Sequence, residues 1–329
     1  MGPVGRGMTA VSSRPGTAVA RLARFTRVRY EPHYLLYAVL FTLALEGTAA
    51  LVSHPDTSWR PGGATVVRIA VVAFVLLYLR MVDEQKDLDY DREHHPDRPL
   101  VTGAVSAGEL RSAMAVIAVG AVAASLALSV PSAVMIAATL GYGLALWGLE
   151  RLSATVRDAI LVNLVVTYPV QLFVIAYVVL SAIDTGQVES RWATAAVAVI
   201  FAGAFLQFEF ARKTAHEPRP GEWFYSNALG AKGSTAAGVG FAVVAVVCDL
   251  ILVRPWIFDA PGAIVAWIPL VLLVFPLWGA GRFLGPAGTL IARPDADPGA
   301  ARAPYPLVGA VLFVLTLYTV LVAQALLLP

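Results

Sequence analysis

The acidic residues that follow the second apolar run have the spacing of one helix face. Seven Asp and Glu residues lie between Asp83 and Leu100, directly after an apolar run that ends near Met81. Asp83, Asp87 and Asp91 recur every four residues, which places them on one side of a helix. Neighbouring carboxylates repel one another unless a cation lies between them, and a divalent metal that holds a phosphorylated ligand is the usual solution. The spacing therefore predicts a divalent-metal site for a diphosphate at a membrane edge.

A solvated helix extension is the alternative interpretation of this stretch. Its acidic side chains would then pair with neighbouring Lys and Arg residues. The triple spacing, the position at the end of an apolar run and the Pro-x-Arg-Pro sequence at 96–99 favour a functional site. Glu84 lies near the same face by helical angle. The predicted metal ligands of this segment are Asp83, Glu84, Asp87 and Asp91.

The composition is that of a polytopic membrane protein. Of the 329 residues, 58% are hydrophobic and only 14% are charged, whereas a soluble domain carries about 25% charged residues. Runs of about 20 apolar residues mark transmembrane helices, and we expect nine, at 33–53, 64–82, 108–129, 131–149, 157–182, 192–211, 233–253, 263–281 and 304–328. The predicted fold is an all-α integral membrane protein with a catalytic domain at 31–329 and a basic tail at 1–30.

The basic residues predict the orientation. Of the 24 Lys and Arg residues, 20 fall in the tail and in the loops near 80–111, 150–157, 212–232 and 282–302. The positive-inside rule places this side in the cytoplasm and the C-terminus on the other face. A net charge of +2 gives no reason to expect a nucleic acid as partner. The excess of Arg over Lys is typical of a GC-rich bacterial genome, so we expect a bacterial cell-membrane protein surrounded by lipid.

A second charged segment follows the sixth predicted span. Glu209, Lys213 and Glu217 repeat the spacing of four residues. This segment lies four spans after the acidic stripe and on the same predicted side of the membrane. Two polar helix ends at that interval indicate a tandem arrangement facing one cavity. Glu209 and Glu217 are therefore predicted ligands of a second metal, and ion pairing with Arg212 or Lys213 is the alternative.

These features resemble the UbiA superfamily of intramembrane prenyltransferases, which includes membrane terpene cyclases. In the family's first motif, acidic residues spaced by four precede a Pro-x-Arg-Pro-Leu run. Asp83, Asp87, Asp91 and the sequence at 96–100 match this motif, and the sequence at 101–103 continues the match. The resemblance covers nearly the whole chain after residue 30. It implies nine helices around an apolar cavity, in which Mg²⁺ held by two motifs binds and ionises a prenyl diphosphate.

Two positions depart from the family pattern. Lys213 stands where the second motif of the family has an Asp, and Glu150 replaces the Lys of a Leu-Lys-Arg element. A lysine in the second motif predicts either one metal fewer or direct contact with the diphosphate.

Cationic side chains on the predicted cytoplasmic side are candidates to bind the diphosphate. Arg and Lys donate hydrogen bonds that strengthen as a leaving group gains charge, and a carboxylate-held Mg²⁺ acts as a Lewis acid. Retention under the positive-inside rule is the alternative for each residue. The candidates are Arg98, Arg151, Arg212, Lys213 and Lys232. Arg98 and Lys213 lie at motif positions, and with Asp83, Asp87 and Asp91 they form the predicted catalytic set.

Polar residues within the spans are few. Glu46 lies in the middle of the first span, where an unpaired carboxylate is costly, so it is expected to face the cavity or an internal partner. Asn163, Tyr168 and Gln171 lie beside Pro169. They predict a kinked helix that lines the cavity, with helix packing as the alternative.

Three functions compete for this chain. The first is Mg²⁺-dependent transfer of a prenyl group from its diphosphate to a lipophilic or aromatic acceptor. The second is a terpene cyclase of the same superfamily, in which the substrate's own double bond traps the cation. The third is a transporter with paired half-repeats, which would carry charged residues near the bilayer midplane. The acids cluster at the membrane edge instead, and acceptor transfer, the commoner outcome in the family, is the function we expect.

Overall fold

The structure is a bundle of long helices, and no strand occurs in the described residues. The computed structural model describes residues 16–219, 221–285 and 304–328. Within these ranges, nine helical segments are long and apolar enough to cross a membrane, which confirms the predicted count. They are α2 (Pro32–Ser53), α3 (Gly63–Lys86), α5 (Ala107–Leu126), α6 (Val130–Leu152), α8 (Ile160–Thr167) with α9 (Pro169–Asp184), α10 (Trp192–Arg212), α11 (Tyr225–Val253), α12 (Gly262–Leu272) with α13 (Val274–Leu284), and α15 (Leu307–Leu327).

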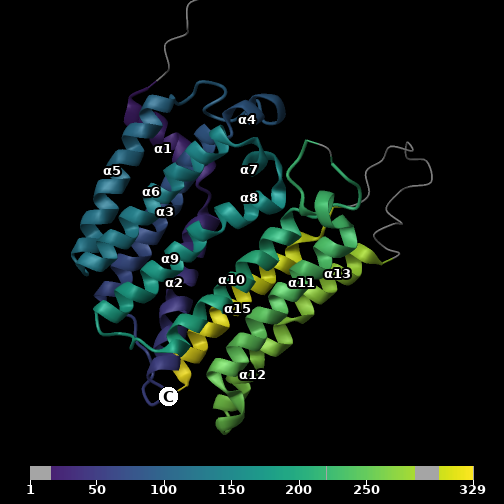
Figure 1. Cartoon of the computed structure of the whole chain (residues 1–329). Coiled ribbons are helices and arrows are strands. Elements are labelled where there is room, and N and C mark those ends of the chain that lie inside the picture. Colours follow the sequence, from purple (N-terminus) through teal and green to yellow (C-terminus); the bar gives the residue numbers. More distant parts are fainter. Residues whose placement is uncertain (1–15, 220, 286–303, 329) are drawn as a thin grey trace, which may run out of the picture.

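Short helices gather at one end of this bundle. They are α1 (Ala18–Arg29), α4 (Leu88–His94) and α7 (Ala154–Asp158), whereas the 3-10 turn η1 (Pro255–Ile257) follows α11. Figure 1 shows α1, α4 and α7 at the top of the view and the C-terminus at the bottom. We call the end with α1, α4 and α7 the charged end, because both charged motifs of the sequence lie there.

The acidic stripe runs from the end of α3 into α4. α3 extends four residues beyond its predicted end and stops at Lys86, and Asp87 alone separates it from α4. The N–H of Asp87 donates to the carbonyl oxygen of Asp83 at 2.9 Å, and the N–H of Asp91 donates to that of Asp87 at 2.8 Å. Because helical hydrogen bonding continues across the junction, the three Asp residues stay on one side of the chain.

The fifth span is broken at the proline that the sequence marked. α8 ends at Thr167 and α9 begins at Pro169. Proline has no N–H, and its ring clashes with the preceding turn, so a continuous helix is interrupted at this point. The predicted kink is therefore present, and it places Tyr168 beside the cavity described below.

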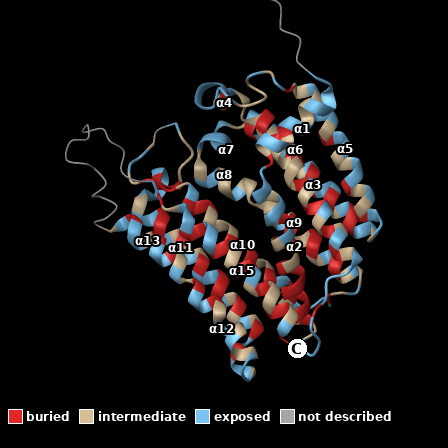
Figure 2. Cartoon of the chain, turned by 180° about the vertical axis from the view of Figure 1, so that it is seen from behind, coloured by how far each residue is buried: buried red, intermediate tan, exposed pale blue. Residues whose placement is uncertain are grey.

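The core forms where the helices meet, around α2. This helix contacts α3, α9, α10 and α15, and buried residues concentrate on the inward faces of the bundle in Figure 2. Phe41, Phe201 and Tyr318 are buried there, with ring centroids 5.5 Å apart for Phe41–Phe201 and 5.2 Å for Phe201–Tyr318. Aromatic contacts of this kind add to the packing that holds membrane helices together.

A buried ion pair joins helices at the end of the bundle opposite the charged end. Arg68, near the start of α3, donates from Nη1 to Oε2 of Glu46 on α2 at 2.7 Å, and both side chains are 0% exposed. Arg68 Nε also donates to Oγ of Ser181 on α9 at 2.7 Å. The mid-span carboxylate of Glu46 therefore has an internal partner, which was one of its two predicted environments.

The predicted tail at 1–30 is partly a helix packed on the bundle. Residues 1–15 lie outside the described residues, but Ala18–Arg29 forms α1, with Phe25 only 1% exposed. Arg21 pairs with Glu109 of α5, and Arg29 Nε donates to Oε1 of Glu84 at 2.6 Å. The described part of the tail is therefore a helix held against the bundle by Phe25 and by two ion pairs.

Candidate active site

A central cavity of about 470 Å³ opens at the charged end and reaches into the bundle. Its mouth is lined by the charged residues Asp83, Lys86, Asp87, Asp91, Arg98, Glu150, Glu209, Arg212 and Lys213. Its depth is lined mainly by apolar side chains, among them Leu76, Leu79, Leu146, Leu164, Val170 and Phe205. Both charged motifs of the sequence therefore meet at the mouth of one cavity whose interior is apolar.

Asp91 is the most deeply placed carboxylate of the first motif. It is 1% exposed and forms an ion pair with Arg98 through Oδ2. Its other oxygen, Oδ1, is buried and has no hydrogen-bond partner among the described residues. A buried carboxylate oxygen without a donor is costly, so this atom marks a place where a cation or a donor from a ligand would be stabilised.

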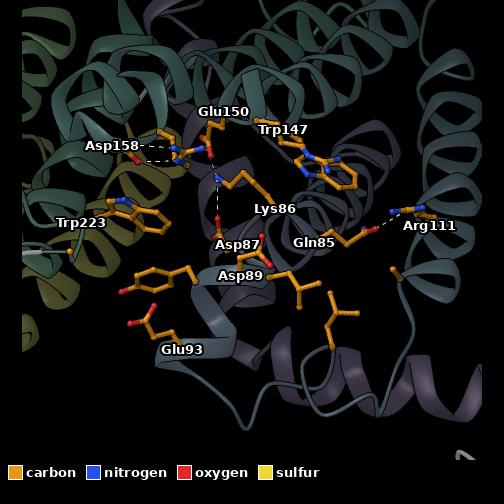
Figure 3. A pocket seen from close by; sticks show the side chains of 17 residues that line it. Gln85, Lys86, Asp87, Asp89, Glu93, Arg111, Trp147, Glu150, Asp158 and Trp223 are labelled. Carbon is orange, nitrogen blue, oxygen red and sulfur yellow. Dashed lines mark hydrogen bonds and ion pairs between the residues drawn. The ribbon is translucent and has the colours of Figure 1, made fainter. Parts of the chain in front are cut away.

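Asp83 and Asp87 share an ammonium group with a third carboxylate. Lys86 Nζ lies 3.6 Å from Oδ1 of Asp83, 3.9 Å from Oδ1 of Asp87 and 3.3 Å from Oε1 of Glu150. Figure 3 shows the Lys86 side chain between Asp87 and Glu150. Asn163 Nδ2 also donates to Oε1 of Glu150 at 3.0 Å, which holds this carboxylate toward the cavity.

The environment of Asp87 favours its protonated form. Burial raises the pKa of the Asp87 carboxyl from 3.8 to about 7; the Lys86 ammonium opposes this rise, and the negative charges of Asp83, Glu150 and Asp91 add to it. A cation placed beside Asp87 would favour its ionised form.

The second motif is dominated by cations. Glu209 accepts from Arg212 Nε at 2.5 Å, pairs with Lys213 Nζ at 2.9 Å, and accepts from the Tyr225 hydroxyl at 3.2 Å. Its carboxylate is only 8% exposed. Glu209 therefore pairs with Arg212 and Lys213, which was the alternative predicted for it. Because three donors already surround its carboxylate, Glu209 presents no free carboxylate for a metal.

Four predicted site residues lie outside the central cavity. Glu84 is 1% exposed and pairs with Arg29 and Arg80. Glu217 is exposed, because α10 ends at Arg212 and the chain continues as a loop. The helical spacing assumed for 209–217 therefore does not exist beyond Lys213. Lys232 is an exposed residue of α11 that lines neither cavity. The structure thus places Glu84, Glu217 and Lys232 apart from the predicted residues that meet at the cavity mouth.

Arg151, the fourth of these residues, lines a second compartment of about 720 Å³ beside the mouth. Trp147, Arg111 and Arg157 also line it, and Arg111 lies over the Trp147 ring at 5.8 Å. The two cavities share five lining residues, which we call the shared wall: Lys86, Asp87, Tyr90, Glu150 and Trp223.

Two features of the shared wall fix its position. One is the Lys86–Glu150 ion pair. The other is the stack of Tyr90 of α4 on Trp223, with ring centroids 4.6 Å apart. The sequence marked neither contact, because each joins residues more than 60 positions apart. The sequence held one indication of the Lys86–Glu150 pair: position 150, a Lys in the family, is an acid here, and the first motif contains a Lys.

The donors at the cavity mouth fit a metal at the first motif but not at the second. Among the described residues, no three His, Cys, Asp or Glu side chains stand close enough together to hold a metal as they are. Asp83, Asp87 and Asp91 nevertheless line one cavity, and Asp91 Oδ1 is buried without a donor. Hard carboxylate oxygens of this kind suit Mg²⁺, which keeps several waters and binds one or two carboxylates beside a phosphate. At the second motif, Glu209 is paired with Arg212 and Lys213, and Glu217 lines neither cavity.

Solved structures with the same fold exist. The apo structure of a UbiA homologue from Aeropyrum pernix K1 has a TM-score of 0.55 at 17% sequence identity, over 87% of this chain and 96% of that one. A structure of digeranylgeranylglyceryl phosphate synthase has a TM-score of 0.54 at 13% identity, over 94% of this chain and 98% of the other. The sequence matches no family model and no curated protein. The chain therefore has the UbiA fold, as its sequence motifs predicted.

Proposed function

We propose that this protein ionises a prenyl diphosphate within the membrane and transfers the prenyl group to a lipophilic or aromatic acceptor. The observation that carries this proposal is the meeting of both charged motifs at the mouth of a cavity with an apolar interior. A prenyl diphosphate has the same division, with a highly charged head and a long apolar chain. The UbiA fold of the chain supports the same class of reaction.

The charged residues divide between the metal and the phosphate. Asp83, Asp87 and Asp91 would hold Mg²⁺, which supplies Lewis-acid neutralisation of the diphosphate when bound. Arg98, which is paired with Asp91, would donate hydrogen bonds to the diphosphate. Arg212 and Lys213 reach the mouth from the opposite motif, where their N–H groups would stabilise the charge that develops on the leaving group.

Ionisation breaks the C–O bond of the allylic carbon, and the electron pair leaves with the diphosphate. The allylic cation that remains must be kept from water until it reacts. Phe205 and Tyr168 lie in the wall of the cavity among aliphatic side chains, and aromatic faces stabilise a nearby cation. An acceptor nucleophile then forms the new bond to the allylic carbon and loses a proton.

The second compartment favours transfer over cyclisation. It lies against the mouth of the central cavity across the shared wall, where an acceptor would stand near the reacting carbon. Its lining combines Trp147 and Trp223 with Arg111, Arg151 and Arg157. The two Trp rings suit an acceptor with a flat or apolar body. The charged lining is mixed, because Asp87, Asp89, Glu93, Glu150 and Asp158 also line this compartment. A cyclase would need no such space outside the prenyl cavity.

An acceptor-dependence assay tests the proposal. Purified protein in detergent with Mg²⁺ is given prenyl diphosphates of different length, first alone and then with acceptors. The panel includes an aromatic carboxylate, a quinol-type ring and a prenylated glyceryl phosphate, the last chosen from the name of the second structural neighbour. We expect diphosphate release to depend on an acceptor, with a prenylated product by mass spectrometry. A defined cyclic terpene formed without acceptor would instead establish a cyclase. If none of the prenyl diphosphates released diphosphate, both prenyl transfer and cyclisation would be refuted.

A further inference from the structure

Lys86 lies among three carboxylates, whereas a lysine in an isolated surface pair has one. Its ammonium lies between 3.3 and 3.9 Å from carboxylate oxygens of Asp83, Asp87 and Glu150. The Lys86 side chain is 19% exposed and that of Glu150 is 7% exposed. Three carboxylates, from α3, from the junction of α3 and α4, and from α6, thus surround one monovalent cation. An isolated surface pair would involve one carboxylate and high exposure.

The surrounding contacts hold this arrangement in place. Asn163 of α8 donates from Nδ2 to Glu150 at 3.0 Å and to the carbonyl oxygen of Val156 at 3.1 Å. α6, α8 and the end of α3 therefore converge on the ammonium. Lys86 lies near Oδ1 of both Asp83 and Asp87, which leaves Oδ2 of each for another ligand.

Charge and distance explain why the ammonium excludes a metal here. Mg²⁺ binds oxygen at about 2.0–2.1 Å, whereas the carboxylate oxygens of Asp83, Asp87 and Glu150 lie 3.3–3.9 Å from Lys86 Nζ. A divalent ion added beside Lys86 would be repelled by it at close range. Without Lys86, the three carboxylates would carry an uncompensated negative charge, which is the condition that attracts a divalent cation.

We propose that Lys86 is a built-in cation that replaces one divalent metal, so that the native chain binds a single Mg²⁺ on the Asp91 side of the stripe. Each motif thus contains a lysine paired with a glutamate: Lys86 with Glu150 in the first, and Lys213 with Glu209 in the second. The inference rests on the proposed metal site at Asp83, Asp87 and Asp91. It predicts that removing the lysine creates a metal site that the native protein does not have.

Metal counting without any prenyl substrate tests this role. Mn²⁺ is titrated into purified protein and followed by electron paramagnetic resonance, with inorganic diphosphate present to complete the coordination. We expect about one Mn²⁺ per chain in the native protein and in Lys86→Arg, and about two in Lys86→Met. In the double variant Lys86→Met with Glu150→Gln, the count should return to about one. Lys232→Met, which removes an exposed lysine outside both cavities, is the matched control and should leave the count unchanged.

Thermal unfolding provides a second measurement if Lys86→Met is unstable without metal. Mg²⁺ should raise the Tm of this variant by more than it raises the Tm of the native protein or of Lys86→Arg. An unchanged Mn²⁺ count together with an unchanged Mg²⁺ effect on Tm would refute the role of Lys86. Neither readout requires turnover, so absence of prenyl transfer in the native protein would refute the proposed function while leaving this result intact.

Discussion

At the scale of single residues, Asp91 combines an ion pair with a buried carboxylate oxygen that has no donor among the described residues. Its Oδ1 atom is buried and unpaired while Oδ2 binds Arg98. We expect Asp91→Asn to slow diphosphate release by about 100-fold or more, because the cavity loses charge where the leaving group must be neutralised. Diphosphate release measured with the best substrate of the panel checks this.

The matched control is Asp97→Asn, six residues along the chain. Asp97 is exposed and lines neither cavity, so this variant should keep native activity. Equal activity of Asp91→Asn and Asp97→Asn would show that the acidic stripe is not the metal site.

Asp87 predicts how Mg²⁺ binding depends on pH. Its pKa of about 7 means that it is mostly protonated at pH 6 and ionised at pH 8. Mg²⁺ competes with this proton, so binding should tighten by about tenfold per pH unit below 7 and level off above it. Isothermal titration at pH 6, 7 and 8 measures the change. In Asp87→Asn, binding should be weaker and nearly independent of pH over this range.

The same shift has a consequence for stability. The folded-state pKa lies above the ordinary value of 3.8, so ionising Asp87 costs more in the folded chain than in the unfolded one. This residue therefore makes the metal-free protein less stable as the pH rises from about 4 to 7. Added Mg²⁺ should offset that loss, and a Tm that is independent of Mg²⁺ at pH 8 would contradict the assignment.

The residues that sequence analysis placed correctly at the cavity are those fixed by local spacing. Asp83, Asp87 and Asp91 follow from a helical period that continues through the junction of α3 and α4. Glu84 has nearly the same helical angle, but its partner Arg29 comes from α1, 55 residues away. Spacing within one segment contains no information about such a partner. For the same reason it gave Lys86 and Glu150 no common role.

At the scale of elements, Glu84 joins α3 to α1 and does not face the cavity. It pairs with Arg29 at 2.5 Å and with Arg80 at 3.2 Å. We expect Glu84→Gln to leave Mg²⁺ binding unchanged while hydrogen exchange of α1 increases, because the helix loses its charged anchor. Hydrogen-exchange mass spectrometry over 18–29 measures this. Loss of Mg²⁺ binding in Glu84→Gln would return this residue to the set of ligands.

The Glu46–Arg68 pair joins α2 to α3 at the opposite end of the bundle. Arg68→Met should destabilise the folded protein by about 3–5 kcal/mol, because it leaves the Glu46 carboxylate buried without its charged partner. The double variant Glu46→Gln with Arg68→Met should recover much of this loss. Arg191→Met is the control at the same end, since Arg191 pairs with Glu189 in an exposed position and should change stability by about 1 kcal/mol or less. Chemical unfolding in detergent compares the three variants.

Most of the membrane-spanning helices could be predicted from the sequence. Hydropathy over about 20 residues is a local property, and the nine predicted spans are confirmed. The predicted span at 192–211 ends within one residue of the end of α10. The spacing of Glu209, Lys213 and Glu217 suggested a longer helix, but the chain leaves the helix after Arg212, where Thr214 bonds to Phe210 and Ser234. The contact with Ser234 of α11 is tertiary, so the periodicity of 209–217 carries no information about it.

At the scale of the whole molecule, the distribution of charge predicts one orientation. The charged end holds α1, α4 and α7 (Figure 1), and the C-terminus lies at the other end. We expect the charged end to face the cytoplasm, because most Lys and Arg residues fall on that side. Protease protection of epitope tags at each terminus, in sealed inverted vesicles, checks this: the N-terminal tag should be cleaved and the C-terminal tag protected. The reverse pattern would place the diphosphate site on the outer face.

The stack of Tyr90 on Trp223 also gives the protein an optical reporter. Trp223 belongs to the shared wall, so a molecule entering either cavity changes the surroundings of its indole ring. The chain has seven Trp residues, and the difference between the emission of the native protein and that of Trp223→Phe isolates the contribution of this one. Entry of the diphosphate and entry of the acceptor can then be timed separately by stopped flow, under conditions in which no product forms. The order in which the two substrates bind thus becomes measurable before the acceptor has been identified.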